Sequence, residues 1–193
     1  MKRLPWLFAV LLVAGCATPT VSKVEQGDQL VAERLAIKLD GPWNRFDGLG
    51  AFPVPTWTVE GVTVDRLQFF VGIKDGKTLV PQSDAAREKR PLTFRASMQP
   101  HEIVALFQTM LTADGSTFDL VKLDPVTFLG GPGLRFEYSL VRRVDEVRLS
   151  GFGYARVNNG ELHAILYQAP RLGFYPRYQP QVDRMAQTAS LRS

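Results

Sequence analysis

The residues best suited to metal or proton chemistry in this sequence are its two histidines, His101 and His163. Transition-metal sites usually gather three or four donors, and the single cysteine, Cys16, stands far from both histidines along the chain. His101 falls in the first turn of a predicted helix, where a solvated side chain is ordinary. His163 falls in a predicted strand, where solvent or a local hydrogen bond satisfies it. We therefore expect no metal and no other cofactor.

Serine and glycine motifs give no clear sign of catalysis. The nucleophile elbow of many hydrolases reads Gly-x-Ser-x-Gly; the nearest pattern, SGFG at residues 150–153, lies in a predicted strand, where glycines mark a bulge or close packing. The glycines of residues 130–133 lack the Lys-Ser/Thr pair that holds phosphate. Asp119 and Asp124 could pair in space for acid–base work, but their spacing does not indicate it. The sequence does not decide whether the protein is an enzyme, and the absence of these motifs favours a protein that is not.

Two aromatic groupings are candidates for a binding surface. Trp43, Phe46, Phe52 and Trp57 lie in a stretch rich in glycine and proline. Rings displayed there on a loop would stack on a glycan or receive a segment of a partner. The alternative, which we favour, is that they cap one end of the core.

The second grouping precedes and opens the last predicted helix. It comprises Arg171, Phe174, Tyr175, Arg177 and Tyr178. Such residues suit anionic lipid head groups or a protein partner, and packing at the helix entry is the alternative. The candidate binding surface is therefore the set Trp43, Phe46, Trp57, Arg171, Tyr175 and Arg177.

The elements that must position these side chains are mostly strands. Alternating or continuous apolar runs between turn residues predict them, at residues 35–39, 56–59, 62–73, 77–80, 134–143, 147–157 and 161–168. Asn158-Asn159-Gly160 favours a tight hairpin, because Asn and Gly tolerate positive φ. Neighbouring strands joined by short turns pair antiparallel by default.

Two helices complete the pattern. Residues 100–112 begin with Pro100 and carry Glu102 in the first turn, where an acidic side chain meets the positive end of the helix dipole. Residues 175–189 place Tyr178, Val182 and Met185 on one stripe. The sequence thus predicts an α+β fold: one domain, residues 32–193, with an antiparallel sheet and both helices packed on it.

The first residues read as a targeting segment. Lys2 and Arg3 precede about ten apolar residues, half of what a membrane span needs. Residues 12–16 (LVAGC) resemble the lipobox of bacterial lipoproteins. The resemblance implies that residues 1–15 are removed and Cys16 is lipidated, which anchors the chain to a membrane. Ala17, in place of an aspartate, favours an outer-membrane anchor facing the periplasm.

Charge and composition add two expectations. The formal charge is +4, and loss of Lys2 and Arg3 leaves +2 with interspersed signs, which argues against a nucleic-acid partner. Residues 16–31 are polar without a period, so we expect a flexible tether. Its root-mean-square reach would be about 20 Å and its extended limit about 45 Å.

The end of the chain resembles PsbP-like domains. A strand LHAILYQAP at residues 162–170 passes into FYPRY at residues 174–178 and on to Met185. The resemblance covers about the last hundred residues. It implies an α/β/α-like sandwich of a kind used to bind other proteins, and it carries over no functional residue.

These observations favour a non-enzymatic binding or accessory module of the cell envelope, held by a lipid anchor, with an envelope protein as the expected partner. Two alternatives remain. One is a hydrolase of envelope polymers, which needs carboxylates facing each other in a cleft. The other is a carrier of a small apolar ligand, which needs an enclosed cavity beneath the sheet.

Overall fold

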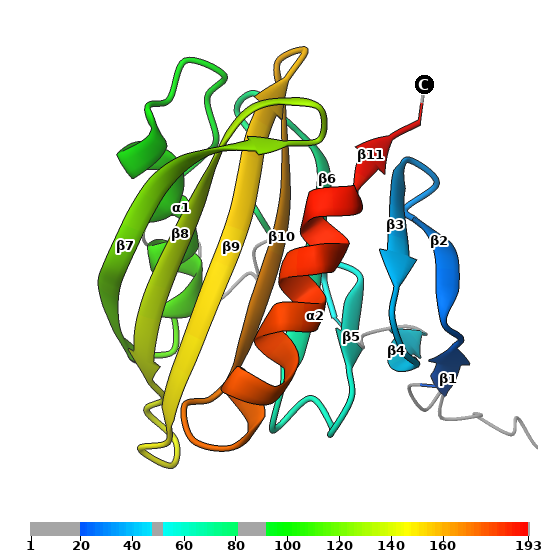
Figure 1. Cartoon of the computed structure of the whole chain (residues 1–193). Helices are drawn as coiled ribbons and strands as arrows, with labels where there is room; N and C mark the ends of the chain where they lie inside the picture. Colours follow the sequence, from blue (N-terminus) through cyan, green and yellow to red (C-terminus); the bar gives the residue numbers. More distant parts are fainter. Residues whose placement is uncertain (1–19, 48–51, 81–91, 193) are drawn as a thin grey trace, which may run out of the picture.

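A computed structural model describes residues 20–47, 52–80 and 92–192. Its main sheet has eight antiparallel strands in the order β1-β4-β5-β6-β10-β9-β8-β7 (Figure 1). The strands are β1 (Thr20–Val24), β4 (Trp43–Asp47), β5 (Thr56–Thr58), β6 (Arg66–Lys74), β7 (Thr117–Phe128), β8 (Gly131–Val141), β9 (Arg148–Asn158) and β10 (Glu161–Pro170). The predicted α+β, antiparallel fold of one domain is confirmed.

Helix α1 (Pro100–Leu111) covers one face of the sheet. It begins where predicted because the Glu102 carboxylate accepts a hydrogen bond from the Gln99 backbone N–H at 2.6 Å, beside Pro100 at the first helical position. Its buried face packs Phe107 against Phe70 and Phe136, with ring centroids 5.3 and 5.2 Å apart. This cluster is the core on the first side of the sheet.

Helix α2 (Phe174–Thr188) covers the opposite face and carries Pro180 inside it. Beside α2 lies a small sheet in the order β11-β3-β2, made of β2 (Gly27–Val31), β3 (Leu35–Leu39) and β11 (Ser190–Leu191). Alternate residues of β3 are buried with Val182 and Met185 of α2. The main sheet thus lies between α1 and a layer formed by α2 and the small sheet.

The predicted tether is wrong from Thr20 onward. Residues 20–31 form β1 and β2, which pair with β4 and β3. Their valines Val24 and Val31 are buried, whereas the polar residues between them face outward. A strand with one solvated face reads as a linker when its apolar residues are few.

Other strand predictions need smaller corrections. Residues 77–80 form no strand, and residues 62–65 belong to the turn before β6. Strand β7 was not predicted at all. Strands β8, β9 and β10 lie where the sequence indicated, and Asn159 and Gly160 have φ of 50° and 77° in the predicted hairpin turn.

Candidate functional site

The first aromatic grouping belongs to the core. Trp43 and Trp57 are 1% and 2% exposed, so the hypothesis that their rings are displayed on a loop is wrong and the favoured one, packing in the core, holds for both. They lie on β4 and β5, which pair with each other, and the Trp57 ring packs on Phe69 with centroids 4.9 Å apart. Phe46 is half-buried and contacts Phe52 edge-on at 5.9 Å. The core-capping alternative accounts for both tryptophans.

The second grouping is divided between core and surface. Tyr175 is half-buried and stacks on Tyr167 with centroids 6.2 Å apart. Tyr167 also meets Trp43 edge-on at 6.3 Å, so it joins the two groupings. Arg171 and Arg177 are exposed. Only these arginines of the six candidates are fully available to a partner.

Arg177 belongs to a small cluster on the first turns of α2. Its Nη1 lies 3.6 Å from Oε1 of Glu60, and its guanidinium lies 5.5 Å from the centre of the Tyr178 ring. The Tyr178 hydroxyl donates to Glu60. Burial, with the Glu60 hydrogen bond, raises the pKa of Tyr178 to about 12, so this hydroxyl stays protonated near neutral pH. The cluster presents the Arg177 guanidinium and the edge of the Tyr178 ring to solvent, and Glu60 holds both side chains in place.

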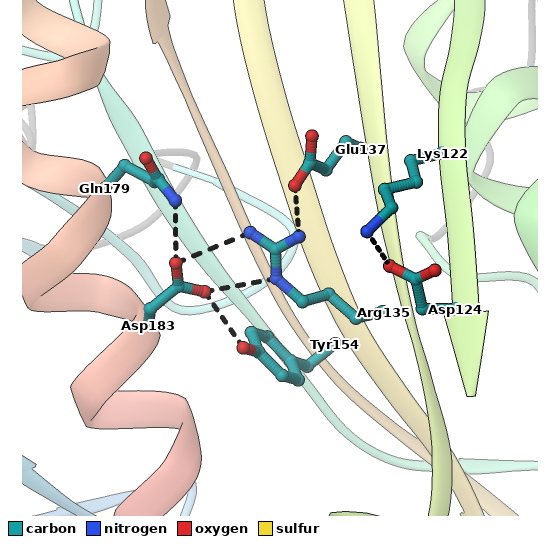
Figure 2. A network of polar contacts seen from close by, with 7 residues as sticks. All are labelled: Lys122, Asp124, Arg135, Glu137, Tyr154, Gln179 and Asp183. Atoms are coloured by element: carbon teal, nitrogen blue, oxygen red, sulfur yellow. Dashed lines mark hydrogen bonds and ion pairs between the residues drawn. The ribbon is translucent and has the colours of Figure 1, made fainter. Parts of the chain in front are cut away.

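The most connected polar site joins α2 to the sheet through Arg135 (Figure 2). Arg135 projects from β8, and its Nε donates to Oδ1 of Asp183 on α2 at 3.2 Å. The same carboxylate accepts hydrogen bonds from the Tyr154 hydroxyl at 2.9 Å and from Nε2 of Gln179 at 2.8 Å. Arg135 Nη1 also donates to Glu137. One guanidinium therefore holds two carboxylates.

Register explains how these side chains meet. Arg135 lies opposite Tyr154 on β9 and Asp124 on β7, so the three share one face of the sheet. On α2, Gln179 and Asp183 are one turn apart and face that row. Asp124 is occupied by Lys122, whose Nζ lies 2.7 Å away.

The environment of Arg135 fixes its charge. Its side chain is 12% exposed, and the guanidinium lies over the Phe152 and Tyr154 rings at 4.9 and 5.6 Å. Burial alone lowers the pKa of Arg135, but the hydrogen bonds to Glu137 and Asp183 outweigh burial and raise it. Burial and the Asp183 charge raise the pKa of Tyr154 to about 12. Arg135 therefore stays charged beside its two carboxylates, and the Tyr154 hydroxyl keeps its proton near neutral pH.

Neither histidine joins this site. His101 is exposed on α1, as expected. His163 is buried, and its Nδ1 accepts a hydrogen bond from the Gly72 backbone N–H on the neighbouring strand β6 at 3.2 Å. Burial and nearby Arg34 lower the pKa of His163, so it is neutral. Within residues 20–47, 52–80 and 92–192, no group of three or more histidine, cysteine or acidic side chains could hold a metal.

The carboxylates and glycines weighed for catalysis have other partners. Asp119 lies opposite Ser139, whereas Asp124 lies opposite Arg135, on the same strand β7. In the SGFG segment, a Cβ at Gly151 would meet the Tyr138 ring at 2.2 Å and one at Gly153 would meet Phe136 at 2.5 Å. These glycines allow rings of β8 to lie against β9, which confirms close packing as their role.

A surface hollow of about 430 Å³ bears on the carrier alternative. Apolar side chains dominate its lining, including Val54, Phe69, Val71, Ile73 and Leu79. It lies open at the surface beside β6, so it is not the enclosed cavity that the alternative required.

The predicted signal and anchor lie outside the described residues, Cys16 among them. None of the described helices combines the length and the apolar character that crossing a membrane requires.

No protein-family model and no curated protein matches this chain. Among solved structures, the chain is similar to cyanobacterial PsbP (CyanoP) from Synechocystis sp. PCC 6803, with a TM-score of 0.57 over 95% of this chain and 98% of that one. The fold is PsbP-like. The identity is 12%, so the likeness shows the fold alone. LpqN of Mycobacterium tuberculosis, described as involved in cell envelope biogenesis, aligns over 92% of this chain and 91% of that one at 8% identity, but its TM-score of 0.36 carries no argument.

The Arg135 network could not have been found from the sequence. Its members stand at positions 135, 137, 154, 179 and 183, and only the sheet register and the docking of α2 bring them together. The one sequence signal is the pairing of Gln179 and Asp183 at i and i+4 on a predicted helix.

Proposed function

We propose that this chain is an envelope lipoprotein, anchored through Cys16 at the outer membrane and facing the periplasm, whose PsbP-like domain binds another envelope protein without catalysing a reaction. The lipobox-like residues 12–16 support the anchor. The sandwich fold supports the binding role, because that fold is the one the sequence resemblance associates with binding other proteins.

One observation carries the choice of binding over catalysis. The two carboxylates that converge in the described domain, Glu137 and Asp183, are both engaged by the same guanidinium. A general acid or base must reach a substrate to exchange a proton with it, and these carboxylates are occupied by hydrogen bonds from Arg135, Tyr154 and Gln179. The network instead ties α2 rigidly to the sheet, which pre-organises whatever α2 presents.

The Arg177–Tyr178–Glu60 cluster is the surface we assign to the partner. Arginine and tyrosine are enriched among the residues that dominate binding energy at interfaces. The Arg177 side chain is 66% exposed, while Tyr178 is held from behind by its hydrogen bond to Glu60. A partner with a carboxylate near an apolar side chain fits this surface.

Site-specific photocrosslinking in intact cells tests the proposal. A photoreactive residue at Arg177 should give one discrete protein adduct. The same residue at Gln108, exposed on α1 across the sheet, is the matched control and should not give that adduct. No adduct at position 177, or equal adducts at both positions, would contradict the binding role. Cleavage of envelope glycan that disappears in Asp183→Asn would favour the hydrolase instead.

The surface hollow beside β6 supports a second candidate that differs from the carrier with an enclosed cavity: a carrier that holds an apolar ligand in an open groove. Its volume is within the range of small-molecule sites, about 300–1,000 Å³. Ile73→Trp would fill it, and Val121→Trp on the exposed part of β7 is the control. Saturable uptake of an apolar dye that only Ile73→Trp abolishes would establish the carrier, and its absence would remove this candidate.

A further inference from the structure

Three turns lie together at one end of the domain, drawn lowest in Figure 1: residues 59–65, 142–147 and 171–173. Backbone and side-chain hydrogen bonds connect them. The Arg171 backbone N–H donates to the Arg148 carbonyl at 3.0 Å. Arg142 Nη1 donates to the Thr63 carbonyl at 2.7 Å. The three turns therefore form one continuous surface.

The tips of two of these turns are apolar and project into solvent. Val144 and Leu172 are 82% and 80% exposed, the highest values among the large apolar residues that the structure describes. Single exposed apolar side chains are ordinary. Here, however, each follows an exposed arginine, Arg143 or Arg171. The same pair, an arginine and then an aliphatic residue, thus stands at both tips.

The turn that carries Val144 is held in place. Arg142 makes two hydrogen bonds to the Asp145 carboxylate, at 2.8 and 2.5 Å, and the Glu146 backbone N–H donates to the Arg142 carbonyl at 2.8 Å. Glu146 has a φ of 57°. Because the turn is already ordered, Val144 can bind a surface without the loss of backbone entropy that ordering a flexible turn would cost.

The charges around the tips favour an anionic surface. Arg143, Arg148 and Arg171 form no ion pair with any described residue, and no lysine lies in these turns. Arg143 Nη1 donates to the backbone carbonyl of the exposed Asp114 at 3.4 Å. On the acidic side, Asp145 is engaged by Arg142 and Glu60 lies against Arg177. Glu146 is the one exposed carboxylate of the 142–147 turn outside these pairs. Three guanidinium groups without a carboxylate ion pair thus surround the two tips, and they suit phosphate groups, which arginine binds in a bidentate manner.

The length of chain before β1 brings the domain close to the membrane. Strand β1 begins at Thr20, and the four residues from Cys16 span at most about 14 Å when extended. Strand β9 alone, with 11 residues, is about 36 Å long. A domain on so short a connection rests against the bilayer. In Figure 1, β1 lies in the lower half of the molecule, toward the end that carries the three turns.

We propose that this end of the domain docks on an anionic phospholipid bilayer, with Val144 and Leu172 inserted among the head groups and Arg143, Arg148 and Arg171 on the phosphates. The proposal rests on the lipid anchor of the proposed function, which supplies the proximity. Shallow insertion of apolar side chains beside basic residues is the general mode of interfacial binding. The docking fixes the orientation of the domain, so α2 stands at a defined angle to the bilayer.

Depth measurement with a single probe tests the docking. In the lipidated full chain the thiol of Cys16 is consumed, so Leu172→Cys supplies the one free thiol for an environment-sensitive fluorophore. The labelled protein is reconstituted in vesicles of phosphatidylcholine with or without phosphatidylglycerol. Val144→Cys is the second probe site. Thr127→Cys, exposed near the opposite end of the sheet, is the control.

We expect blue-shifted emission, quenched by spin-labelled lipid, at positions 172 and 144 in phosphatidylglycerol vesicles and not at 127. Arg143→Glu with Arg171→Glu should abolish the shift, and Arg171→Lys should retain most of it. Vesicle-bound protein whose probe at 172 behaves like that at 127 would overturn the docking and leave the anchor intact. A probe at 172 protected in native envelopes but not in vesicles would also overturn it, in favour of a protein. Failure to retain the protein on vesicles would overturn the anchor and the docking with it.

Discussion

The replacement Asp183→Ala probes the joint between α2 and the sheet. It removes the carboxylate that receives hydrogen bonds from Arg135, Tyr154 and Gln179. Arg135 keeps Glu137 and its place over the Phe152 ring, but its Nε loses its partner while its side chain is 12% exposed. The variant therefore leaves a largely buried charge and a buried hydroxyl incompletely satisfied.

The expected loss follows from these contacts. Breaking a buried ion pair by removing one partner costs about 3–5 kcal/mol, and one hydrogen bond to a charged group contributes roughly 1.5–3 kcal/mol. Because Glu137 still neutralises Arg135, we expect Asp183→Ala to lower the free energy of unfolding by about 3 kcal/mol, the lower end of that range. Asp124→Ala is the matched control: it removes a carboxylate from Lys122 in a pair whose side chains are 59% and 36% exposed. Exposed pairs contribute about 0–1 kcal/mol.

Urea unfolding followed by tryptophan fluorescence measures both variants, because the buried Trp43 and Trp57 report on the core beneath α2. A loss of about 3 kcal/mol corresponds to roughly 6–12 °C in Tm for a domain of this size. Asp183→Asn, which keeps the shape and one acceptor oxygen, should fall between the control and Asp183→Ala. If Asp183→Ala loses no more stability than Asp124→Ala, the network does not hold α2 and the reasoning is refuted.

Three further predictions concern the core, a turn and the response to pH. Trp57→Ala should cost about 3–5 kcal/mol in thermal unfolding followed by circular dichroism; a folded variant of unchanged Tm would contradict the core placement of the ring. Gly160→Val should cost about 1–3 kcal/mol, because its φ is 77° and a Cβ there meets no atom within 4 Å, so the cost is conformational; an unchanged urea midpoint would speak against this turn. The pKa of Tyr154 rises to about 12 in the folded chain. The stabilisation that the protonated Tyr154 gives the folded chain is present below pH 10, and it is lost at up to about 1.4 kcal/mol per pH unit between pH 10 and 12. Urea midpoints across that range should fall less steeply for Tyr154→Phe than for the unmodified chain, and identical slopes would refute the raised pKa of Tyr154.

The fold was predictable where local signals agreed. Helix α1 has a proline at its start, an acidic first turn and an apolar stripe, and strands β9 and β10 meet at an Asn-Gly turn. Strand β7 lacked such signals, because it is an edge strand with Pro125 inside it and mostly exposed side chains. Charges and proline on an edge discourage pairing with other chains, and they also hide the alternation that identifies a strand.

The candidate site was less predictable than the fold. In the sequence, Trp43 and Trp57 stand in one short aromatic stretch. The burial of their side chains depends on the pairing of β4 with β5 and on the layer of α2 and β3 above them. Arg135 and Asp183 are 48 residues apart, and their meeting depends on register and helix docking. Val144 and Leu172 are exposed because each lies at the tip of a turn. The hydrophobic pattern of the sequence predicts burial for such residues, so it does not predict this exposure.

The proposed anchor at Cys16 underlies both the proposed localisation and the membrane docking, and mass spectrometry of the N-terminal peptide of the protein isolated from native membranes tests it most directly. We predict a chain that begins at Cys16 and carries a diacylglyceryl group on its sulfur, and a Cys16→Ser variant that remains an unprocessed precursor. A membrane-bound protein with an unmodified Cys16, or normal processing of Cys16→Ser, would contradict the account.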